Sequence, residues 1–446
     1  MKIKPFQPAD LCDDPFDQSD LFGQKGMATQ LQSLFANLEH GSVALLEGRW
    51  GVGKTTFVRR LKRLVEVNGQ PVIYFDAFES DYMESPFEAL SGVFVKAAYD
   101  QGKKDDPKYR SFLRSAAKAG KHIAGTAAKI GVRAATVGII GSEEIEKLGG
   151  MRETIADALS EKSEEIVEAL IESHVQKSAE FAQLGKSIRD LPSLLGKDEN
   201  SNQKMLVIID ELDRCRPDFS LGILETIKHF FNAENIHFIL VTNRDHLMLS
   251  VNHKYGVANL SNEYLDKFFD FSIFFDVQSV DEHGQGLRRF VQDSSSQIIN
   301  TSKNGASDLV DLAYDLARSF NLSLRQIERL TTTLALSYIA ETERQFRPNA
   351  YVGVLCLMKI LDVSLYKKAK LGHLTYDDYT NFMANGSPVS NRRMEWIDQM
   401  FEYALKPESR NEPHLKRYEG LASNFYLEDA RIIPFICNSI LDRFGV

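Results

Sequence analysis

One octapeptide of the chain reads Gly48-Arg49-Trp50-Gly51-Val52-Gly53-Lys54-Thr55 and matches the spacing GxxxxGK[ST] without a gap. An apolar run, Val43–Leu46, precedes it, and Phe57, Leu61 and Leu64 follow at the spacing of one helix face. The pattern predicts a buried strand, a glycine-rich turn and a helix. A chance glycine turn with a surface lysine is the competing interpretation, and the strand and helix on either side argue against it.

The predicted turn suits a polyphosphate. Glycines let backbone N–H groups point inward, and the amino end of the following helix adds partial positive charge. Lys54 is expected to reach the β and γ phosphates, and the hydroxyl of Thr55 is expected to bind Mg²⁺. The expected phosphate-binding residues are Gly48, Arg49, Trp50, Gly51, Val52, Gly53, Lys54, Thr55 and Thr56.

Further apolar runs predict the strands of one sheet. These runs lack polar alternation, which is typical of parallel strands buried on both faces between layers of helices. They cover Pro71–Phe78, Met205–Ile209, Ile236–Val241 and Phe271–Val277, and helical stretches are expected at Pro86–Tyr99 and Leu221–Phe231. Beyond about Ser279 the periodicity becomes helical, so an all-helical C-terminal region is expected.

The interval between Lys54 and Asp210 is far longer than the roughly 60 residues that two βαβ steps need. We therefore expect an insertion between these two positions. The predicted organisation is a nucleotide-binding core of residues 1–100 and 201–279, a helical insertion of residues 101–200, and a helical region of residues 280–446.

The insertion is divided by charge. Gln101–Arg133 contains nine Lys and Arg residues against Asp105 and Asp106, whereas Glu143–Glu172 contains ten acidic and three basic residues. We favour two antiparallel helices that pair these opposite charges. Contact of the basic stretch with nucleic acid is the less favoured alternative.

Acidic and amide side chains follow two of the predicted strands. Asp210 ends the Met205–Ile209 run, where a carboxylate can bind the metal at the carboxyl edge of the sheet. Glu211 comes next, and on an extended strand its side chain would point elsewhere, toward an attacking water. Asn243 follows Val241 by two residues and could hydrogen-bond the γ-phosphate or that water. The competing roles are a helix cap for Asp210, a solvated charge for Glu211 and a turn residue for Asn243.

Four arginines are candidates for neutralising charge in the transition state of phosphoryl transfer, within the chain or from a neighbouring subunit. They are Arg214, Arg244, Arg325 and Arg329, and Arg325 is the one we assign to catalysis. A surface or salt-bridge role is an equal alternative for each.

Composition narrows the class of protein. The 446 residues carry a net charge of -9, which argues against general coating of nucleic acid or anionic membranes. Cys12, Cys215, Cys356 and Cys437 form no CxxC pair, which favours reduced, cytosolic thiols over disulfides or zinc. No signal sequence or run of 18 apolar residues occurs, and Lys129 and Arg133 interrupt the nearest approach, at residues 123–141. We expect a cytoplasmic protein without membrane spans.

Several motifs together resemble the KAP family of P-loop NTPases. The resemblance spans about Asp20 to Arg329. Besides the octapeptide it rests on Ile208–Cys215 with its acid pair, on Asp76-Ala77-Phe78, on Tyr264–Phe269 and on Ser323–Arg329. Two departures matter: the second acid is commonly Asp in the family and is Glu211 here, and the insertion is too polar for the membrane helices of many members. The chain therefore resembles the soluble bacterial members, some of which exclude phages.

The resemblance implies an α/β fold of the additional-strand class of P-loop NTPases, with ATP and Mg²⁺ as ligands. It implies an ATP-hydrolysing switch or assembly factor, acting as a homo-oligomer or on a partner effector protein, with a role in anti-phage defence. Three alternatives stay open: an ATP-locked scaffold that does not hydrolyse, an ATPase stimulated by nucleic acid, and a small-molecule kinase. The residues alone do not distinguish ATP from GTP.

Overall fold

The computed structural model describes residues 16, 20–137, 178–196, 203–256, 261–277, 281, 284–296, 306–340, 349–387, 391–419, 428 and 431–443. Contacts within the chain divide it into two units. One consists of residues 27–48 and 54–275, and the other of residues 1–26, 49–53 and 276–446. The tip of the glycine-rich turn, residues 49–53, thus belongs by its contacts to the unit that contains the C-terminal helices.

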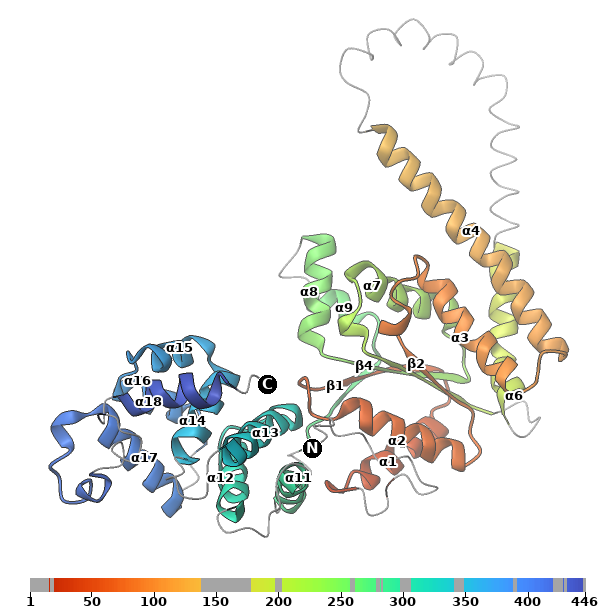
Figure 1. The fold of residues 1–446 in the computed structure, drawn as a ribbon. Coiled ribbons are helices and arrows are strands. Elements are labelled where there is room, and N and C mark those ends of the chain that lie inside the picture. The colour runs from red at the N-terminus through yellow and green to blue at the C-terminus, as the bar shows by residue number, and fades with distance from the viewer. Residues whose placement is uncertain are drawn as a thin grey trace, which may run out of the picture. The chain divides into compact units, whose positions relative to one another are not determined.

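A five-stranded parallel sheet forms the centre of the first unit (Figure 1). Its strands are β1 (Ser42–Glu47), β2 (Val72–Asp76), β3 (Met205–Asp210), β4 (Ile236–Thr242) and β5 (Phe271–Phe274), in the order β2-β3-β4-β1-β5. Strand β4 pairs with both β1 and β3, so it separates the strand before the turn from the strand that ends in Asp210. This confirms the predicted parallel sheet with an additional strand.

Burial along the strands explains their composition. Every residue of β3 and β4 is buried, as the continuous apolar runs predicted. The edge strand β5 pairs only with β1 and stops at Phe274, short of the expected Val277. Strand β2 ends at Asp76, because the side chain of Asp76 accepts hydrogen bonds from the N–H groups of Phe78 and Glu79 and starts a turn.

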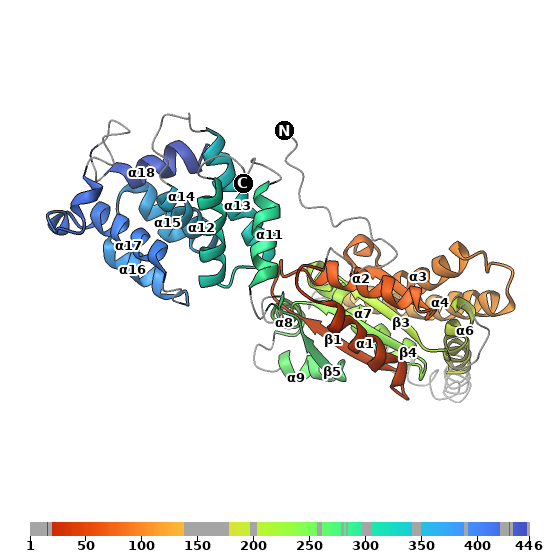
Figure 2. The ribbon, with the colours of Figure 1, turned by 90° about the horizontal axis from the view of Figure 1, so that it is seen from below.

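Helices cover both faces of this sheet. Helices α1 (Lys25–Asn37) and α2 (Lys54–Val67) lie on one face (Figure 2), and α3 (Pro86–Asp100), α7 (Pro217–Thr226) and α8 (Arg244–Tyr255) lie on the other. Successive side chains of β3 point alternately to the two faces of the sheet. Met205, Val207 and Ile209 join the core beneath α3 and α7, so Asp210 points to the face of α1 and α2.

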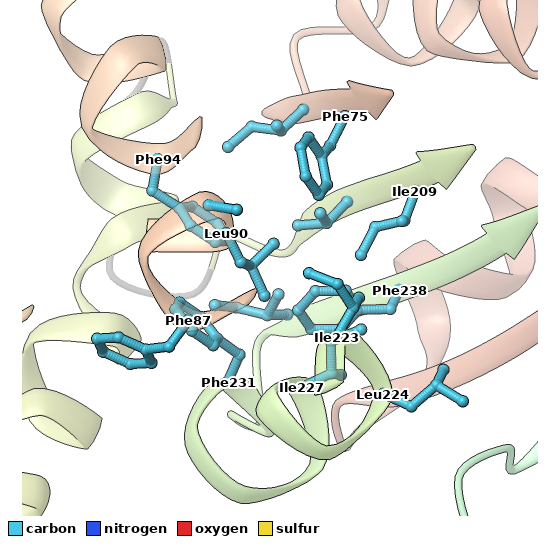
Figure 3. Packing of buried hydrophobic residues seen from close by; sticks show 14 of the residues in the cluster. Phe75, Phe87, Leu90, Phe94, Ile209, Ile223, Leu224, Ile227, Phe231 and Phe238 are labelled. Carbon is cyan, nitrogen blue, oxygen red and sulfur yellow. The ribbon is translucent and has the colours of Figure 1, made fainter. Parts of the chain in front are cut away.

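Aromatic side chains from helices and strands fill the core beneath α3 and α7 (Figure 3). Phe94 of α3 stacks on Phe231, with ring centroids 5.2 Å apart and planes at 8°. The predicted single helix Leu221–Phe231 is in fact α7 followed by a π-helical turn, Ile227–Phe231. That turn places Phe231 where Phe87 and Phe94 of α3 both contact it.

The predicted insertion contributes α4 (Pro107–Val137), a helical stretch at residues 178–189 and α6 (Leu191–Leu195). The chain returns beside α4, since His122 Nε2 lies 2.5 Å from Glu180 Oε2. Among the residues of α4 whose burial is described, 107–123, the exposed basic ones are Arg110, Arg114, Lys118 and Lys121. The acidic stretch Glu143–Glu172, expected to pair with them, lies outside the described residues. Within the described residues, no helix has the length and apolar character needed to cross a membrane.

The described residues after 276 are mainly helical, and several of their helices pack against α14 (Asn349–Leu361). Residues 350–358 of α14 are all buried. Gly353 lets α12 approach, because a Cβ at this position would lie 3.0 Å from the side chain of Leu312. The main helices of this region are α11 (Gln285–Ser296), α12 (Ala306–Ser319), α13 (Leu324–Ala340), α15 (Val363–Leu371), α16 (Tyr376–Ala384), α17 (Arg392–Leu405) and α18 (Ile432–Ile436). The predicted all-helical C-terminal region is confirmed over these residues.

Candidate nucleotide-binding site

The glycine-rich turn joins β1 to α2 through two left-handed residues. Gly51 has φ 78° and Gly53 has φ 96°, conformations that other residue types rarely adopt. Val52 between them is buried, whereas Trp50 is 45% exposed. Helix α2 begins at Lys54, so its first turn, with Thr55 and Thr56, has backbone N–H groups that no intrahelical acceptor can satisfy. Such a turn suits the predicted binding of a polyphosphate.

The side chain of Lys54 folds back into the turn. Its Nζ donates to the carbonyl oxygen of Gly48 at 2.5 Å. Burial lowers the pKa of Lys54, and the charges of Asp213, Asp210 and Glu211 oppose that shift. The ammonium is therefore partly desolvated, and a phosphate entering the turn would compete with a main-chain carbonyl for it.

Asp210 is 2% exposed and accepts hydrogen bonds on both carboxylate oxygens. Its Oδ2 accepts from the hydroxyl of Tyr74 at 2.9 Å, and its Oδ1 accepts from the backbone N–H of Glu211 at 2.8 Å. Burial raises the pKa of Asp210, while hydrogen bonds from Thr55 and Tyr74 act in the opposite direction. The described contacts assign Asp210 no helix-capping role.

Glu211 does not continue the strand, so the expectation of simple strand alternation was wrong. Its backbone is left-handed, with φ 60° and ψ 27°, and a 3-10 turn, Leu212–Arg214, follows directly. A left-handed conformation costs a residue with a Cβ about 1–2 kcal/mol. It turns the Glu211 side chain toward α2, where Oε1 accepts from the Thr55 hydroxyl at 3.4 Å.

The carboxylate of Glu211 is also paired with a cation. Its Oε2 lies 2.6 Å from Nε of Arg214. Burial, and after it the charge of Asp210, raises the pKa of Glu211, whereas Arg214 lowers it. Glu211 is therefore more basic than an exposed glutamate, which suits a group that accepts a proton from water.

Two residues, Thr55 and Asp210, could hold a magnesium ion here. Mg²⁺ commonly takes one or two protein ligands and completes its shell with phosphate oxygens and water, so this small donor set fits it. Within the described residues, no cluster of three or more His, Cys, Asp and Glu side chains could hold a metal without such help. Asp76, in register with Asp210 on the adjacent strand, adds negative charge to the same edge.

Asn243 lies directly after β4 and caps α8. Its Oδ1 accepts from the backbone N–H of Asp245 at 3.0 Å. Asn243 is therefore a structural residue of the turn, as the competing interpretation held. This role does not prevent the predicted hydrogen bond to the γ-phosphate or the attacking water. With the oxygen used by the cap, both N–H groups of the amide can still donate to another ligand.

The four candidate arginines have different surroundings. Arg214 pairs with Glu211, and Arg244 pairs with Asp266. The backbone N–H of Arg325 donates to the carbonyl oxygen of Gly51 at 3.3 Å, while its side chain is exposed. Arg329, one turn further along α13, is also exposed. Among the described contacts of these four arginines, the hydrogen bond to the turn is made by the backbone N–H of Arg325.

Tyr74 and Arg59 are the two site residues that the sequence patterns missed. Tyr74 was counted only as part of an apolar strand, although it is a diagonal neighbour of Asp210 on the same face. Arg59 lies one turn after Thr55 on α2, with its guanidinium 5.4 Å from the centroid of the Tyr74 ring. The available signal was a tyrosine two residues before Asp76 in an otherwise apolar strand.

Comparisons with known proteins identify the family of this chain. No curated protein matches the sequence. The solved structure of the Aeropyrum pernix ORC2 protein, in ADPNP and ADP complexes, is similar at 13% identity, covering 94% of each chain with a TM-score of 0.35. The model for the KAP family P-loop domain matches residues 25–339. Because this match spans more than half of the sequence and includes the turn, both acids and Asn243, the chain belongs to the KAP family of P-loop domains.

Proposed function

We propose that this protein is a Mg²⁺-dependent ATPase. One observation carries the proposal: Thr55, Asp210 and Glu211 meet at the carboxyl edge of the sheet, with Thr55 Oγ1 3.4 Å from Glu211 Oε1. A metal-binding hydroxyl, a metal-binding carboxylate and a separate base are the parts that hydrolysis of a nucleoside triphosphate requires. The choice of ATP over GTP comes from the family resemblance.

Each residue has one task in this mechanism. Lys54 exchanges the Gly48 carbonyl for the β and γ phosphates, Asn243 donates its amide N–H groups to the γ-phosphate or the attacking water, and Arg325 neutralises developing charge. Magnesium, when bound with the nucleotide, would polarise the phosphoryl oxygens. Glu211 accepts the proton of the attacking water, and its raised pKa strengthens it as a base.

Phosphate release from ATP and from GTP by the purified chain tests this proposal. Glu211→Gln should bind ATP normally and turn over about 10²–10⁴-fold more slowly, because it removes only the base. Glu66→Gln is the matched control, since Glu66 lies near the far end of α2 and pairs there with Lys62. Equal rates for Glu211→Gln and the unmodified chain would exclude Glu211 as the base.

The proposed output of the nucleotide cycle is a change at the C-terminal helices. Within the unit that contains residues 49–53, Arg49 donates to the carbonyl oxygen of Asn321 at 3.0 Å, and Gly51 accepts from Arg325. A turn that closes on phosphates would move both contacts. We therefore infer a cytoplasmic switch or assembly factor acting on copies of itself or on an effector protein. The proposed role in anti-phage defence rests on the family resemblance. The proposed domain boundaries rest on the sequence patterns.

An ATP-locked scaffold is the second candidate function. The observation that favours it is that Lys54 and Glu211 are both engaged by groups of the chain itself, Gly48 and Arg214. Negligible turnover together with ATP-dependent assembly, measured by native mass spectrometry, would support the scaffold over the enzyme. The exposed basic residues of α4 motivate one further arm of the assay, with DNA and with RNA added. Stimulated turnover that weakens with salt would support the nucleic-acid alternative.

A further inference from the structure

We propose that Tyr74 is the positioning residue of the magnesium site, and that Arg59 in turn orients Tyr74. Tyr74 would act through Asp210 and touch neither nucleotide nor metal. This inference rests on the proposed Mg²⁺-dependent binding of ATP. It extends that proposal by naming which side chains fix the metal-binding carboxylate.

The hydroxyl of Tyr74 and the backbone N–H of Glu211 orient the carboxylate of Asp210 from opposite oxygens. Tyr74 donates to Oδ2 at 2.9 Å, and Glu211 donates to Oδ1 at 2.8 Å. Two donors on two oxygens fix the rotation of the carboxylate plane. Each oxygen keeps a lone pair for the metal or for a water bound to it.

Strand geometry explains why a tyrosine performs this task. Asp76 of β2 is in register with Asp210 of β3, so Tyr74, two residues earlier, is a diagonal neighbour on the same face. Diagonal neighbours in a sheet are roughly 7–8 Å apart, a gap that long or aromatic side chains can bridge. A phenylalanine would fill the same space and lack the donor, which makes it a clean replacement.

Thr55 cannot replace Tyr74 once the site is loaded. Its hydroxyl interacts with Asp210 and with Glu211 Oε1 in this structure. Its oxygen is the group expected to bind the metal, so the Thr55 hydroxyl is not a donor reserved for Asp210. The donor from β2 belongs to the sheet and does not depend on the conformation of the glycine-rich turn.

Arg59 connects this network to α2. Thr55 and Arg59 are four residues apart and therefore lie on one face of the helix. The guanidinium of Arg59 lies 5.4 Å from the Tyr74 ring centroid, and its charge also acts on Asp210 and Asp76. One helix thus presents the metal-binding hydroxyl and the residue that restrains the tyrosine.

The experiment is a Mg²⁺ titration of the full chain with mant-ATP, read by fluorescence, for Tyr74→Phe and the unmodified protein. The Mg²⁺ concentration at half-maximal binding should rise about 10–100-fold in Tyr74→Phe, as it does when residues that support metal ligands are removed. Affinity for mant-ATP in EDTA should stay unchanged. Arg59→Gln should shift the Mg²⁺ requirement in the same direction by a smaller factor.

Tyr109→Phe is the control, because Tyr109 is a buried tyrosine of α4 that belongs to the core beneath α3 and α7, on the face of the sheet opposite to Asp210. An unchanged Mg²⁺ requirement in Tyr74→Phe would overturn the positioning role while leaving the proposed function intact. A loss of mant-ATP binding in EDTA, or a lower Tm, with no change in the Mg²⁺ requirement would show a purely structural role. Absence of any Mg²⁺-dependent binding by the unmodified chain would overturn both proposals.

Discussion

Replacing Asn243 separates its two tasks, because the cap uses the amide oxygen and the proposed catalytic contact uses the amide nitrogen. Asn243→Ala removes both. Loss of an Asn cap costs about 1 kcal/mol, which corresponds to a fall in Tm of about 2–4 °C for a unit of this size. Loss of one donor to the developing charge should lower kcat by about 10²–10³-fold.

Asn243→Asp keeps the cap, since a carboxylate accepts from the Asp245 N–H as well as an amide does. Its Tm should equal or exceed that of the unmodified chain. The new charge would face the phosphates, and like charges about 4 Å apart in a medium of effective dielectric about 20 repel by about 4 kcal/mol. Both ATP affinity and kcat should therefore fall in this variant, in contrast to its stability.

The assay pairs thermal unfolding with steady-state phosphate release for both variants and for Asn243→Ser, which caps but has no amide. Hydrolysis at the normal rate by Asn243→Asp would refute the contact with phosphate or water. A Tm for Asn243→Asp as low as that of Asn243→Ala would refute the cap. The cap and the contact with phosphate or water can thus be refuted independently.

Four further outcomes are expected. Arg214→Ala should move the acidic limb of the kcat profile to higher pH, because Arg214 lowers the pKa of Glu211, whereas Arg214→Lys should leave that limb near its original position. Burial lowers the pKa of His237 to about 4 from the usual 6.5, so the unfolded chain binds more protons than the folded chain between these pH values. The free energy of unfolding should therefore fall by up to about 3 kcal/mol as the pH drops from 6.5 to 4. His237→Leu should remove that part of the pH dependence, measured by urea unfolding. Gly51→Ala should lower Tm more than Gly23→Ala, because both have positive φ but only at Gly51 would the new Cβ lie 2.7 Å from Arg325 Cβ; equal losses would argue against close packing of the turn on Arg325. Lys54→Ala should abolish mant-ATP binding with Tm preserved, and a retained affinity would exclude Lys54 from phosphate binding.

Local patterns predicted most of the nucleotide-binding fold. The strands Ser42–Glu47, Met205–Asp210 and Ile236–Thr242 differ by at most one residue at each end from the predicted runs, because continuous apolar residues need burial on both faces. The edge strand β5 was overestimated at Val277, since an edge strand has only one partner to extend its pairing.

The candidate site was predictable in composition and less so in geometry. Glycine spacing and the acids after β3 are visible along the chain, and the structure brings Thr55 and Glu211 together. The left-handed backbone of Glu211 and its pairing with Arg214 were not predictable, because the tertiary contacts of a single residue can override its local preference. The hydrogen bond from Tyr74 to Asp210 joins two adjacent strands that are far apart in the sequence, and it has no signature in sequence spacing.

The sequence by itself therefore determined the glycine-rich turn, the parallel sheet, the positions of the candidate site residues along the chain and the family to which the chain belongs. These properties follow from short-range periodicity and from residue types that only particular backbones accept. Tertiary structure alone decided that the tip of the turn packs with Ser323 and Arg325, and that Tyr74 orients Asp210. Such contacts join residues far apart in the chain, and their energies depend on which side chains the closed fold brings within a few ångströms of each other.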